Sequence, residues 1–480
     1  YPRIGPDREL KRAVESYWAG RSDVATLRAE AAALRSRTRA HLRELGLTGE
    51  AAVPADFTYY DQVLQVTTAF GALPERFTDL AGAAAPGSEH RGTDLDGFFT
   101  AARGEGERAA LEMTKWMDSN YHYLVPEIGP DTVIDYRPGF GGIDPTDGPV
   151  AQVLEALAAG EDAPRPVVVG PVSYLLLAKA ADGAPDGFHP LDRLDDVLHA
   201  YGHLLADLWA AGAGWVQLDE PALVSDAWDV ERERVLEVTA RAYTWLSAIA
   251  ERPQILLAAG YGSLGDALPV VASTGVEAVA VDLVAGALPE AADLAGLAGR
   301  TLVAGVVSGR NVWRCDLAAA LDTLEALRAA LPADARLVVG TSTSLQHVPH
   351  DAARETGIDE DVRSWLAFAD QKIVEVSTLA AGLRQGREAV SPALEEDARL
   401  RAARASHPGV RREDVRAAVA GVTQADRIRA PYEERRAAQQ ERLGLPLLPT
   451  TTIGSFPQTP EIRRARADHR AGQLDDAGYE

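Results

Sequence analysis

The spacing of hydrophobic positions changes along the chain, and the changes predict a repeated pattern of strands and helices. Residues 6–45 carry apolar side chains at helical spacing, with a break near Gly20 where Ser22 or Asp23 can cap a second helix. Beyond them, short β-rich runs alternate with longer helical segments, which is typical of parallel βαβ units. The predicted strands are Arg3–Ile4, Asp56–Thr58, Pro166–Gly170, Trp215–Leu218, Ile255–Ala258, Ala278–Leu283, Leu302–Val307 and Leu337–Gly340.

Eight strands separated by helices favour a closed barrel over an open sheet. The sequence therefore predicts an α/β protein built on a (β/α)8 TIM barrel. Polar side chains follow several of the predicted strands directly, as at Asp219-Glu220, Ser308–Asn311 and Thr341–Thr343. A barrel carries its functional loops at this end of its strands.

The pattern changes after the predicted barrel, to which we assign residues 1–385. Residues 386–445 are rich in Arg, Glu and Ala without a strand signal, which indicates a helical linker. Residues 446–480 open a new segment that partly repeats the start of the chain: Phe456-Pro457 before Glu461-Ile-Arg-Arg-Ala465, against Tyr1-Pro2 before Glu9-Leu-Lys-Arg-Ala13. We expect the first elements of a second, truncated barrel, because so short a segment cannot bury a core of its own.

Composition and charge narrow the classes of function. Apolar residues make up 46% and charged residues 25% of the 480 positions, which is typical of a soluble globular protein. No apolar run is long enough to cross a bilayer and no secretory signal is recognisable, so we expect a cytoplasmic protein. We also expect it to be a monomer. A net charge of −23 argues against nucleic acid or an anionic membrane as partner. The single cysteine, Cys315, excludes a disulfide framework and a cysteine-rich zinc site.

Lysine is rare here, with 44 arginines but only Lys11, Lys115, Lys179 and Lys372. Arg8 and Lys11 stand three apart at the start of the first predicted helix, so they share a face beside free backbone N–H groups. Two cations there oppose the helix dipole, and a ligand with several carboxylates would offset the mismatch. The alternative is a solvated helix start. Lys115 lies in a run predicted as helical, and the alternative to ligand binding there is a surface salt bridge. Lys179 and Lys372 are expected to pack their alkyl stems and expose their charged heads.

Several motifs, taken in order, resemble one enzyme family. They are Tyr1-Pro-Arg-Ile-Gly5, Arg8-Glu-Leu-Lys11, Glu112-Met-Thr-Lys-Trp116 with Asn120-Tyr-His-Tyr123, Gly170-Pro-Val172, Asp219-Glu-Pro-Ala222, Gly309-Arg-Asn-Val-Trp-Arg314 and Thr450-Thr-Thr-Ile-Gly-Ser-Phe-Pro-Gln-Thr459. Through these motifs the chain resembles the cobalamin-independent methionine synthases from end to end.

The resemblance implies two barrels face to face. Between them the methyl group of 5-methyltetrahydropteroyltri-L-glutamate passes to zinc-bound L-homocysteine and gives L-methionine, the last step of methionine biosynthesis. Zinc suits this step because a coordinated thiol is deprotonated at neutral pH. The resemblance places the zinc ligands in the second barrel, beyond residue 480. We therefore assign no catalytic and no metal-binding residue, and we expect the 480-residue chain by itself to be inactive.

The resemblance also implies binding residues within this sequence. It assigns the folate and its triglutamate tail to Arg8, Glu9, Leu10, Lys11 and Lys115, and homocysteine or methionine to Ile453, Gly454 and Ser455. A glycine permits close approach of an amino-acid ligand, and a serine hydroxyl can hydrogen-bond to it.

Other conspicuous side chains receive no catalytic role. The family uses a motif like Asp219-Glu220 for catalysis in its second barrel, and here we interpret it as a remnant that hydrogen-bonds at the barrel top. His347 and His350 flank a proline that breaks the geometry of a metal site, and Cys315 is interpreted as an incidental thiol. Two alternatives stay open: a fragment that only binds folate or acts as a scaffold, and a related barrel that uses a corrinoid methyl donor.

Overall fold

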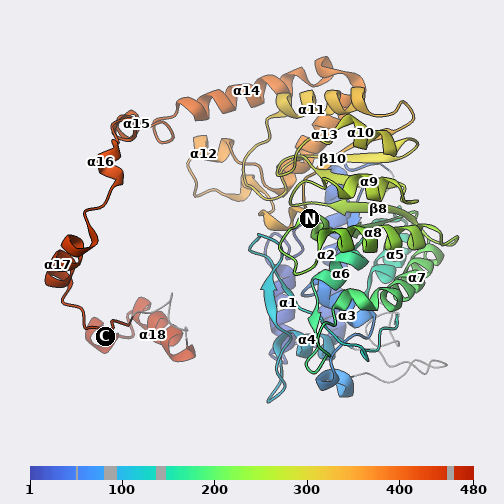
Figure 1. Ribbon diagram of the computed structural model, residues 1–480, viewed down its shortest axis with the longest axis horizontal. Coiled ribbons are helices and arrows are strands. Elements are labelled where there is room, and N and C mark those ends of the chain that lie inside the picture. Colours follow the sequence, from blue (N-terminus) through green and yellow to red (C-terminus); the bar gives the residue numbers. More distant parts are fainter. Residues whose placement is uncertain (50–51, 81–93, 137–146, 451–458, 480) are drawn as a thin grey trace. The chain divides into compact units, whose positions relative to one another are not determined.

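A computed structural model describes the chain in five stretches, residues 1–49, 52–80, 94–136, 147–450 and 459–479 (Figure 1). The chain divides into two compact units, Tyr1–His407 and Pro408–Glu480. The first unit has α/β architecture, and the second is helical where it is described. None of the helices in these stretches combines the length and apolar character needed to span a membrane.

A parallel sheet of seven strands runs through the first unit, with the strands in sequence order. They are β1 (Pro54–Ala55), β5 (Arg165–Val169), β7 (Trp215–Asp219), β8 (Gln254–Ala259), β9 (Ala278–Asp282), β10 (Thr301–Val307) and β11 (Arg336–Thr341). Pro54 of the first strand and Val338 of the last line the same cavity, so the sheet is curled. The predicted α/β class and the later six strands are confirmed, and β1 ends one residue before its predicted place.

The strand predicted at Arg3–Ile4 is wrong. These residues form a turn, in which the Leu10 N–H donates to the Ile4 carbonyl at 3.1 Å and the Arg8 N–H to the Gly5 carbonyl at 3.0 Å. Two prolines flank this short stretch and remove backbone donors that a strand would need, while Gly5 has a φ of 82°. Within the described residues β1 and β11 are therefore the two edges of the sheet, and no pairing joins them.

Helices connect the strands and cover the sheet. In Figure 1 they follow one another in chain order from green α7 to yellow α11. Helix α7 buries Val197, Tyr201, Leu204 and Leu208, an apolar stripe at helical spacing. The connecting helices are α3 (Gln62–Ala69), α4 (Leu95–Arg103), α5 (Pro149–Ala158), α6 (Pro171–Leu176), α7 (Leu194–Ala210), α8 (Arg232–Ser247), α9 (Ala267–Ala272), α10 (Ala291–Leu294), α11 (Leu317–Ala330), α12 (Glu360–Ser364) and α13 (Ala369–Gln385).

Two helices precede the sheet, α1 (Glu9–Trp18) and α2 (Val24–Glu44). The predicted break is confirmed, because Gly20 has a φ of 65° and the Asp23 carboxylate accepts the Thr26 N–H at 2.8 Å. Two further short pairs of strands lie beside the main sheet. The hairpin joins β2 (Met113–Lys115) to β3 (His122–Leu124), and β4 (Glu127–Ile128) pairs with β6 (Lys179–Ala180).

Arginines of α2 hold this helix against the segment that contains α5. Arg35 and Arg39 are almost fully buried and both bind Glu155, with Arg39 Nη1 3.0 Å from Glu155 Oε1. Arg39 also binds Glu161, at 2.9 Å, and Arg43 binds the same carboxylate at 2.8 Å. We call this the arginine ladder. Bidentate guanidinium groups suit such shared carboxylates better than lysines would.

Helix α14 (Ser391–Ser406) belongs to the first unit although it lies in the predicted linker. Its Asp397 and Leu400 are buried, and Asp397 accepts the Leu317 N–H of α11 at 3.3 Å. The second unit contains α15 (Glu413–Ala420), α16 (Gln424–Arg427), α17 (Tyr432–Leu443), α18 (Pro460–Arg470) and α19 (Asp476–Tyr479). The two compact units thus separate after His407, because α14 packs against α11.

The arginine ladder gives a stability prediction. Arg39→Ala should lower the free energy of unfolding by about 2–3 kcal/mol, because it leaves Glu155 and Glu161 half-buried with fewer donors. Arg37→Ala is the matched control on the same helix, since Arg37 is 56% exposed and lies 3.9 Å from its partner Glu9. It should change stability by less than about 0.5 kcal/mol. Urea unfolding measures both, and equal losses would contradict a structural role for the ladder.

Candidate functional site

The residues Arg8 and Lys11 form the exposed start of α1. Arg8 immediately precedes the helix and has a left-handed backbone, with φ 61° and ψ 37°, which is uncommon for a residue other than glycine. Lys11 is about half exposed and lies 3.6 Å from Glu15, one turn further along the helix. A surface pair of this kind contributes little, so the ammonium remains accessible to an anion in solution.

Glu9 and Leu10 have structural contacts in the same segment. The Glu9 carboxylate folds back and accepts the Asp7 N–H at 2.9 Å, which places an acid at the positive end of the helix. Gly5 has a left-handed backbone, with φ 82°, which favours glycine in this turn, and a Cβ there would also displace the Glu9 carboxylate. Leu10 is buried. The Leu10 N–H donates to the Ile4 carbonyl, and Glu9 offsets part of the charge mismatch at the helix start.

Lys115 lies on strand β2, so the predicted helical run is wrong. The hairpin pairs Met113 with Leu124 and Lys115 with His122. Residues two apart on a strand point to the same face, so Lys115 shares the face of Leu124. Leu124 packs in the same core cluster as Leu10 of α1. The structure therefore places Lys115 on the same hairpin face as Leu124, whose core cluster also includes Leu10 of α1.

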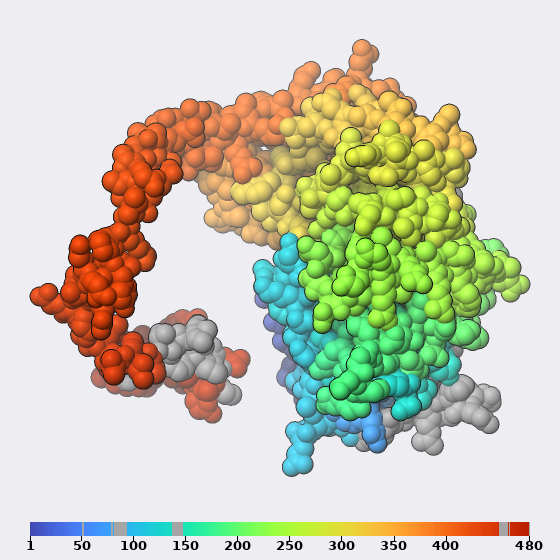
Figure 2. Space-filling model, viewed as in Figure 1, coloured from blue at the N-terminus to red at the C-terminus, as the bar shows by residue number. Residues whose placement is uncertain are grey.

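The hairpin is exposed where Lys115 lies. The chain around this residue, cyan in Figure 2, is at the molecular surface, and Met113, Thr114 and Lys115 are all exposed. Lys115 forms no ion pair with any other residue that the structure describes. Its ammonium is thus available, and so are the exposed side chains of Arg8 and Lys11 at the start of α1. These three cations form what we call the cation site.

Glu220 has a structural role at the end of β7. It is fully buried and accepts the N–H groups of Val172 and Ser173, at 3.1 and 2.6 Å, and the Tyr243 hydroxyl at 2.6 Å. Burial raises its pKa despite these bonds. The interpretation of this motif as hydrogen bonding at the strand ends is confirmed for Glu220, which joins the start of α6 to α8.

Asp219 faces a cavity inside the curled sheet, of about 420 Å³. Its carboxylate accepts the Gln217 side-chain amide at 2.6 Å, and Gln217 in turn accepts Arg165 Nε at 3.1 Å. Burial raises the pKa of Asp219 to about 7. A carboxyl that titrates near neutrality can carry a proton, but the cation site lies on α1 and the hairpin, outside the residues that line this cavity.

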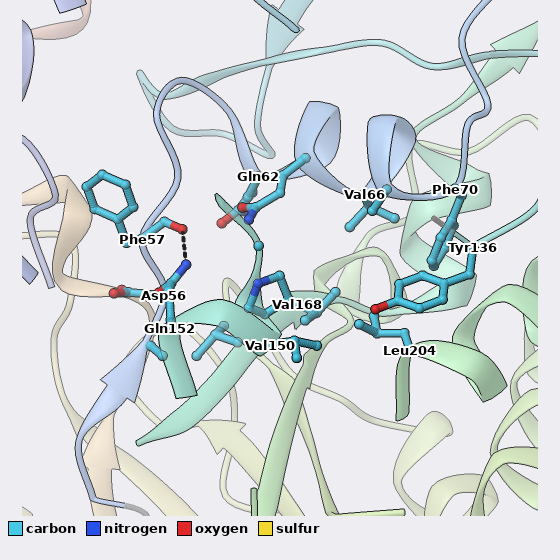
Figure 3. Close-up of a pocket in the computed structure, with 16 residues that line it drawn as sticks. Asp56, Phe57, Gln62, Val66, Phe70, Tyr136, Val150, Gln152, Val168 and Leu204 are labelled. Atoms are coloured by element: carbon cyan, nitrogen blue, oxygen red, sulfur yellow. Dashed lines mark hydrogen bonds between the residues drawn. The ribbon is translucent and has the colours of Figure 1, made fainter. Parts of the chain in front are cut away.

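A second, smaller cavity lies against the outer face of the sheet. It measures about 60 Å³, too little for a folate, and the Gln152 amide donates to the Phe57 carbonyl at its edge, at 2.9 Å (Figure 3). Figure 3 shows its apolar wall formed by Val66, Phe70, Tyr136, Val150, Val168 and Leu204. We assign this cavity no ligand.

The remaining titratable candidates are structural. Burial raises the pKa of the Cys315 thiol to about 12, so this thiol stays protonated and unreactive. Lys372 is fully buried and donates to the Trp313 carbonyl at 3.0 Å, so the expected exposed head is wrong. His347 bonds to the Tyr261 hydroxyl at 2.7 Å, and burial lowers its pKa to about 4. The described residues contain no group of three His, Cys, Asp or Glu that could hold a metal.

A protein-family model matches most of the chain and identifies its family. Residues 1–332 match the model of the "Cobalamin-independent synthase, N-terminal domain", and residues 448–480 match that of its "Catalytic domain". The chain belongs to the cobalamin-independent methionine synthase family. Membership of this family removes the corrinoid-dependent barrel as an alternative.

Relatives in this family match the chain from end to end. A protein of Streptomyces griseus is 50% identical over 485 residues, and one of Rhodococcus jostii is 49% identical over 483 residues. Both are named 5-methyltetrahydropteroyltriglutamate–homocysteine methyltransferase, and the chain spans 59% of the length of each. A putative vitamin-B12-independent methionine synthase from Listeria monocytogenes covers 80% of this chain, and this chain 94% of it, at 11% identity and a TM-score of 0.44. We draw no conclusion from a structural similarity with so low a TM-score.

The structure describes only part of the site that the sequence predicted. Ile453, Gly454 and Ser455 lie outside the described residues. Conversely, three side chains that sequence reasoning gave no role, Arg3, Tyr121 and Asp61, join the start of the chain to the hairpin. Arg3 and Tyr121 belong to motifs that the family resemblance quoted, which was the one available signal.

Asp219 should make the stability of the protein depend on pH. Its folded pKa of about 7 exceeds the ordinary 3.8, so the folded state favours the protonated form. The free energy of unfolding should therefore fall as the pH rises from 4 to 8, by on the order of a few kcal/mol from this group. Asp219→Asn should flatten that slope, and Asp226→Asn, an exposed control after the same strand, should leave it unchanged. Urea unfolding across this range is the measurement, and an unchanged slope in Asp219→Asn would contradict the assignment.

Proposed function

We propose that the chain is the folate-side part of an enzyme that moves the methyl group of 5-methyltetrahydropteroyltri-L-glutamate to L-homocysteine. The observation that carries this proposal is the cation site. Arg8 immediately precedes α1, Lys11 lies on it, and Lys115 lies on the hairpin face of Leu124, whose core cluster includes Leu10 of α1. A triglutamate tail offers several carboxylates, and cations on two adjacent elements suit an extended polyanion better than a single charge.

In this proposal each part of the site has a limited task. Arg8 can engage a carboxylate with its guanidinium fork, while Lys11 and Lys115 act as point charges. Glu9 and the Leu10 backbone shape the turn that presents them. Ile453, Gly454 and Ser455 would contact homocysteine. Zinc would activate the homocysteine thiol in the longer protein, with its ligands beyond residue 480, and the described residues contribute no ligand set for it.

We also propose that the sheet closes as an eight-stranded barrel. Tyr1 lies between the two sheet edges, packed in one cluster with Val53 before β1 and Leu345 after β11. The cavity beside it is lined by Pro54 on one side and Val338 on the other. Closure requires a pairing partner for the two edges. The division into residues 1–385, 386–445 and 446–480, the latter opening a second barrel, and a monomeric cytoplasmic state remain our predictions.

The proposed function predicts a difference between ligands. In the full-length protein, Lys11→Ala and Lys115→Ala should each raise the KM for triglutamyl folate about tenfold and leave the KM for monoglutamyl folate nearly unchanged, because the shorter ligand lacks the distal carboxylates. Methionine formation from homocysteine is the readout.

Matched controls lie on the same two elements. Arg12→Ala removes an exposed cation from α1, and Thr114→Ala truncates an exposed residue on the opposite face of β2. Neither should distinguish the two folates. Equal losses for both folates in the lysine variants would exclude tail binding at these residues, and no methionine formation by the full-length protein would exclude the proposed reaction.

Barrel closure has its own test. Arg336 and Ser342 donate their N–H groups toward β10, to the Arg300 and Val307 carbonyls at 2.7 and 2.8 Å. The alternate residues Leu337, Val339 and Thr341 therefore direct theirs to the open edge. Hydrogen exchange at these three amides should be at least about tenfold slower in the full-length protein than in the 480-residue chain. Arg336 and Ser342 serve as internal controls, and equal exchange at the three amides would argue for an open sheet.

A further inference from the structure

The cation site is divided between two pieces of chain that are far apart in sequence. Arg8 and Lys11 follow the first turn, whereas Lys115 lies on the hairpin. A ligand that bridges both pieces binds well only if their separation is fixed before it arrives, since ordering them on binding costs free energy. Something in the protein must therefore hold the first turn against the hairpin.

A chain of hydrogen bonds joins these two pieces. Arg3, in the turn before α1, donates from Nη2 to the Tyr121 hydroxyl at 3.1 Å. Tyr121, in the hairpin between β2 and β3, donates the same hydroxyl to Asp61 Oδ1 at 2.9 Å. The other oxygen of Asp61 accepts the N–H groups of Leu64 in α3 and Leu124 in β3, at 2.8 and 3.2 Å.

The order of donors in this chain is fixed by chemistry. A guanidinium can only donate hydrogen bonds and a carboxylate can only accept them, so the Tyr121 hydroxyl is the group that links the two. Asp61 is 1% exposed. Burial raises the pKa of Tyr121 further above its ordinary value, which keeps the hydroxyl protonated. Arg3 Nη1 is buried and has no hydrogen-bond partner among the described residues, so Tyr121 is its main polar anchor there.

We propose that Arg3, Tyr121 and Asp61 are positioning residues that fix the distance between the two halves of the cation site. This inference rests on the proposed binding of a polyglutamate tail at Arg8, Lys11 and Lys115. The three residues need not touch the ligand. They give the protein selectivity for a polyanion long enough to contact both α1 and the hairpin, because only such a ligand depends on the separation that they set.

Removal of one hydroxyl tests this inference. Tyr121→Phe keeps the ring, over which the Arg3 guanidinium lies at 5.5 Å, and removes the link to Asp61. In the full-length protein it should raise the KM for triglutamyl folate about five- to tenfold, with little change in the KM for monoglutamyl folate or in kcat. Tyr123→Phe is the matched control in the same hairpin, because the Tyr123 hydroxyl donates to the Leu177 carbonyl at 3.0 Å, away from Arg3.

A double variant separates positioning from general stability. Once Lys115→Ala has removed the hairpin contact, Tyr121→Phe should cause no further rise in the KM for the triglutamyl ligand, whereas a structural defect would add to the first loss. Arg3→Gln provides a second route if Tyr121→Phe folds poorly, because it breaks the same link from the other end and leaves the Tyr121–Asp61 bond intact. It should show the same discrimination between ligands.

The outcomes distinguish this inference from the proposed function. Equal losses for both folates in Lys115→Ala itself would mean that the tail does not bind there, which removes the basis of both. Discrimination in Lys115→Ala together with none in Tyr121→Phe and Arg3→Gln would overturn the positioning role alone. Additive losses in the double variant would overturn it as well. Discrimination in all three single variants, without additivity, is the expected result.

Discussion

A carboxylate buried in a protein must find a hydrogen-bond donor for its oxygens, and this requirement shapes the loops at the ends of the strands. Asp61 draws together α3, β3 and Tyr121, and Glu220 joins the start of α6 to α8. Asp282 accepts the N–H groups of Tyr261, Val284 and Ala285. Each of these acids fixes segments that would otherwise be free, because an unpaired buried charge costs several kcal/mol. Of these acids, Asp61 supports the hairpin that carries Lys115, and none of the three is assigned to the ligand.

The strands in the middle of the sheet could be predicted closely from the sequence. The runs for β8, β9 and β10 are almost wholly apolar because parallel strands are buried on both faces, and such runs are easily recognised. The prediction was wrong at Arg3–Ile4 and displaced at β1, where prolines adjoin very short apolar stretches. Lys115 was expected on a helix because the polar residues around it have no clear period, and pairing with the other arm of the hairpin decided the structure there.

The site was predictable as a set of residues but not as an arrangement. The rarity of lysine and the family motifs single out Arg8, Lys11 and Lys115. That Lys372 is buried, or that Arg3 meets Tyr121, depends on contacts between residues 59 and 118 positions apart. Local spacing contains no signal for such pairs. The burial of individual arginines could not be predicted either, because arginines occur both on the surface and in the buried arginine ladder.

The scarcity of lysine also gives the protein an unusual chemical profile. Of its four side-chain amines, that of Lys372 is enclosed in the core, and that of Lys179 lies 2.9 Å from Glu112 and 3.6 Å from Glu127. The other two, on Lys11 and Lys115, are exposed at the cation site. Lys179 is 42% exposed but ion-paired, so among the described residues an acylating reagent that attacks primary amines would find its unpaired side-chain target at Lys115 and weakly paired ones at Lys11 and Lys179. Two of the three amines open to covalent modification therefore belong to the region proposed to bind the polyanion.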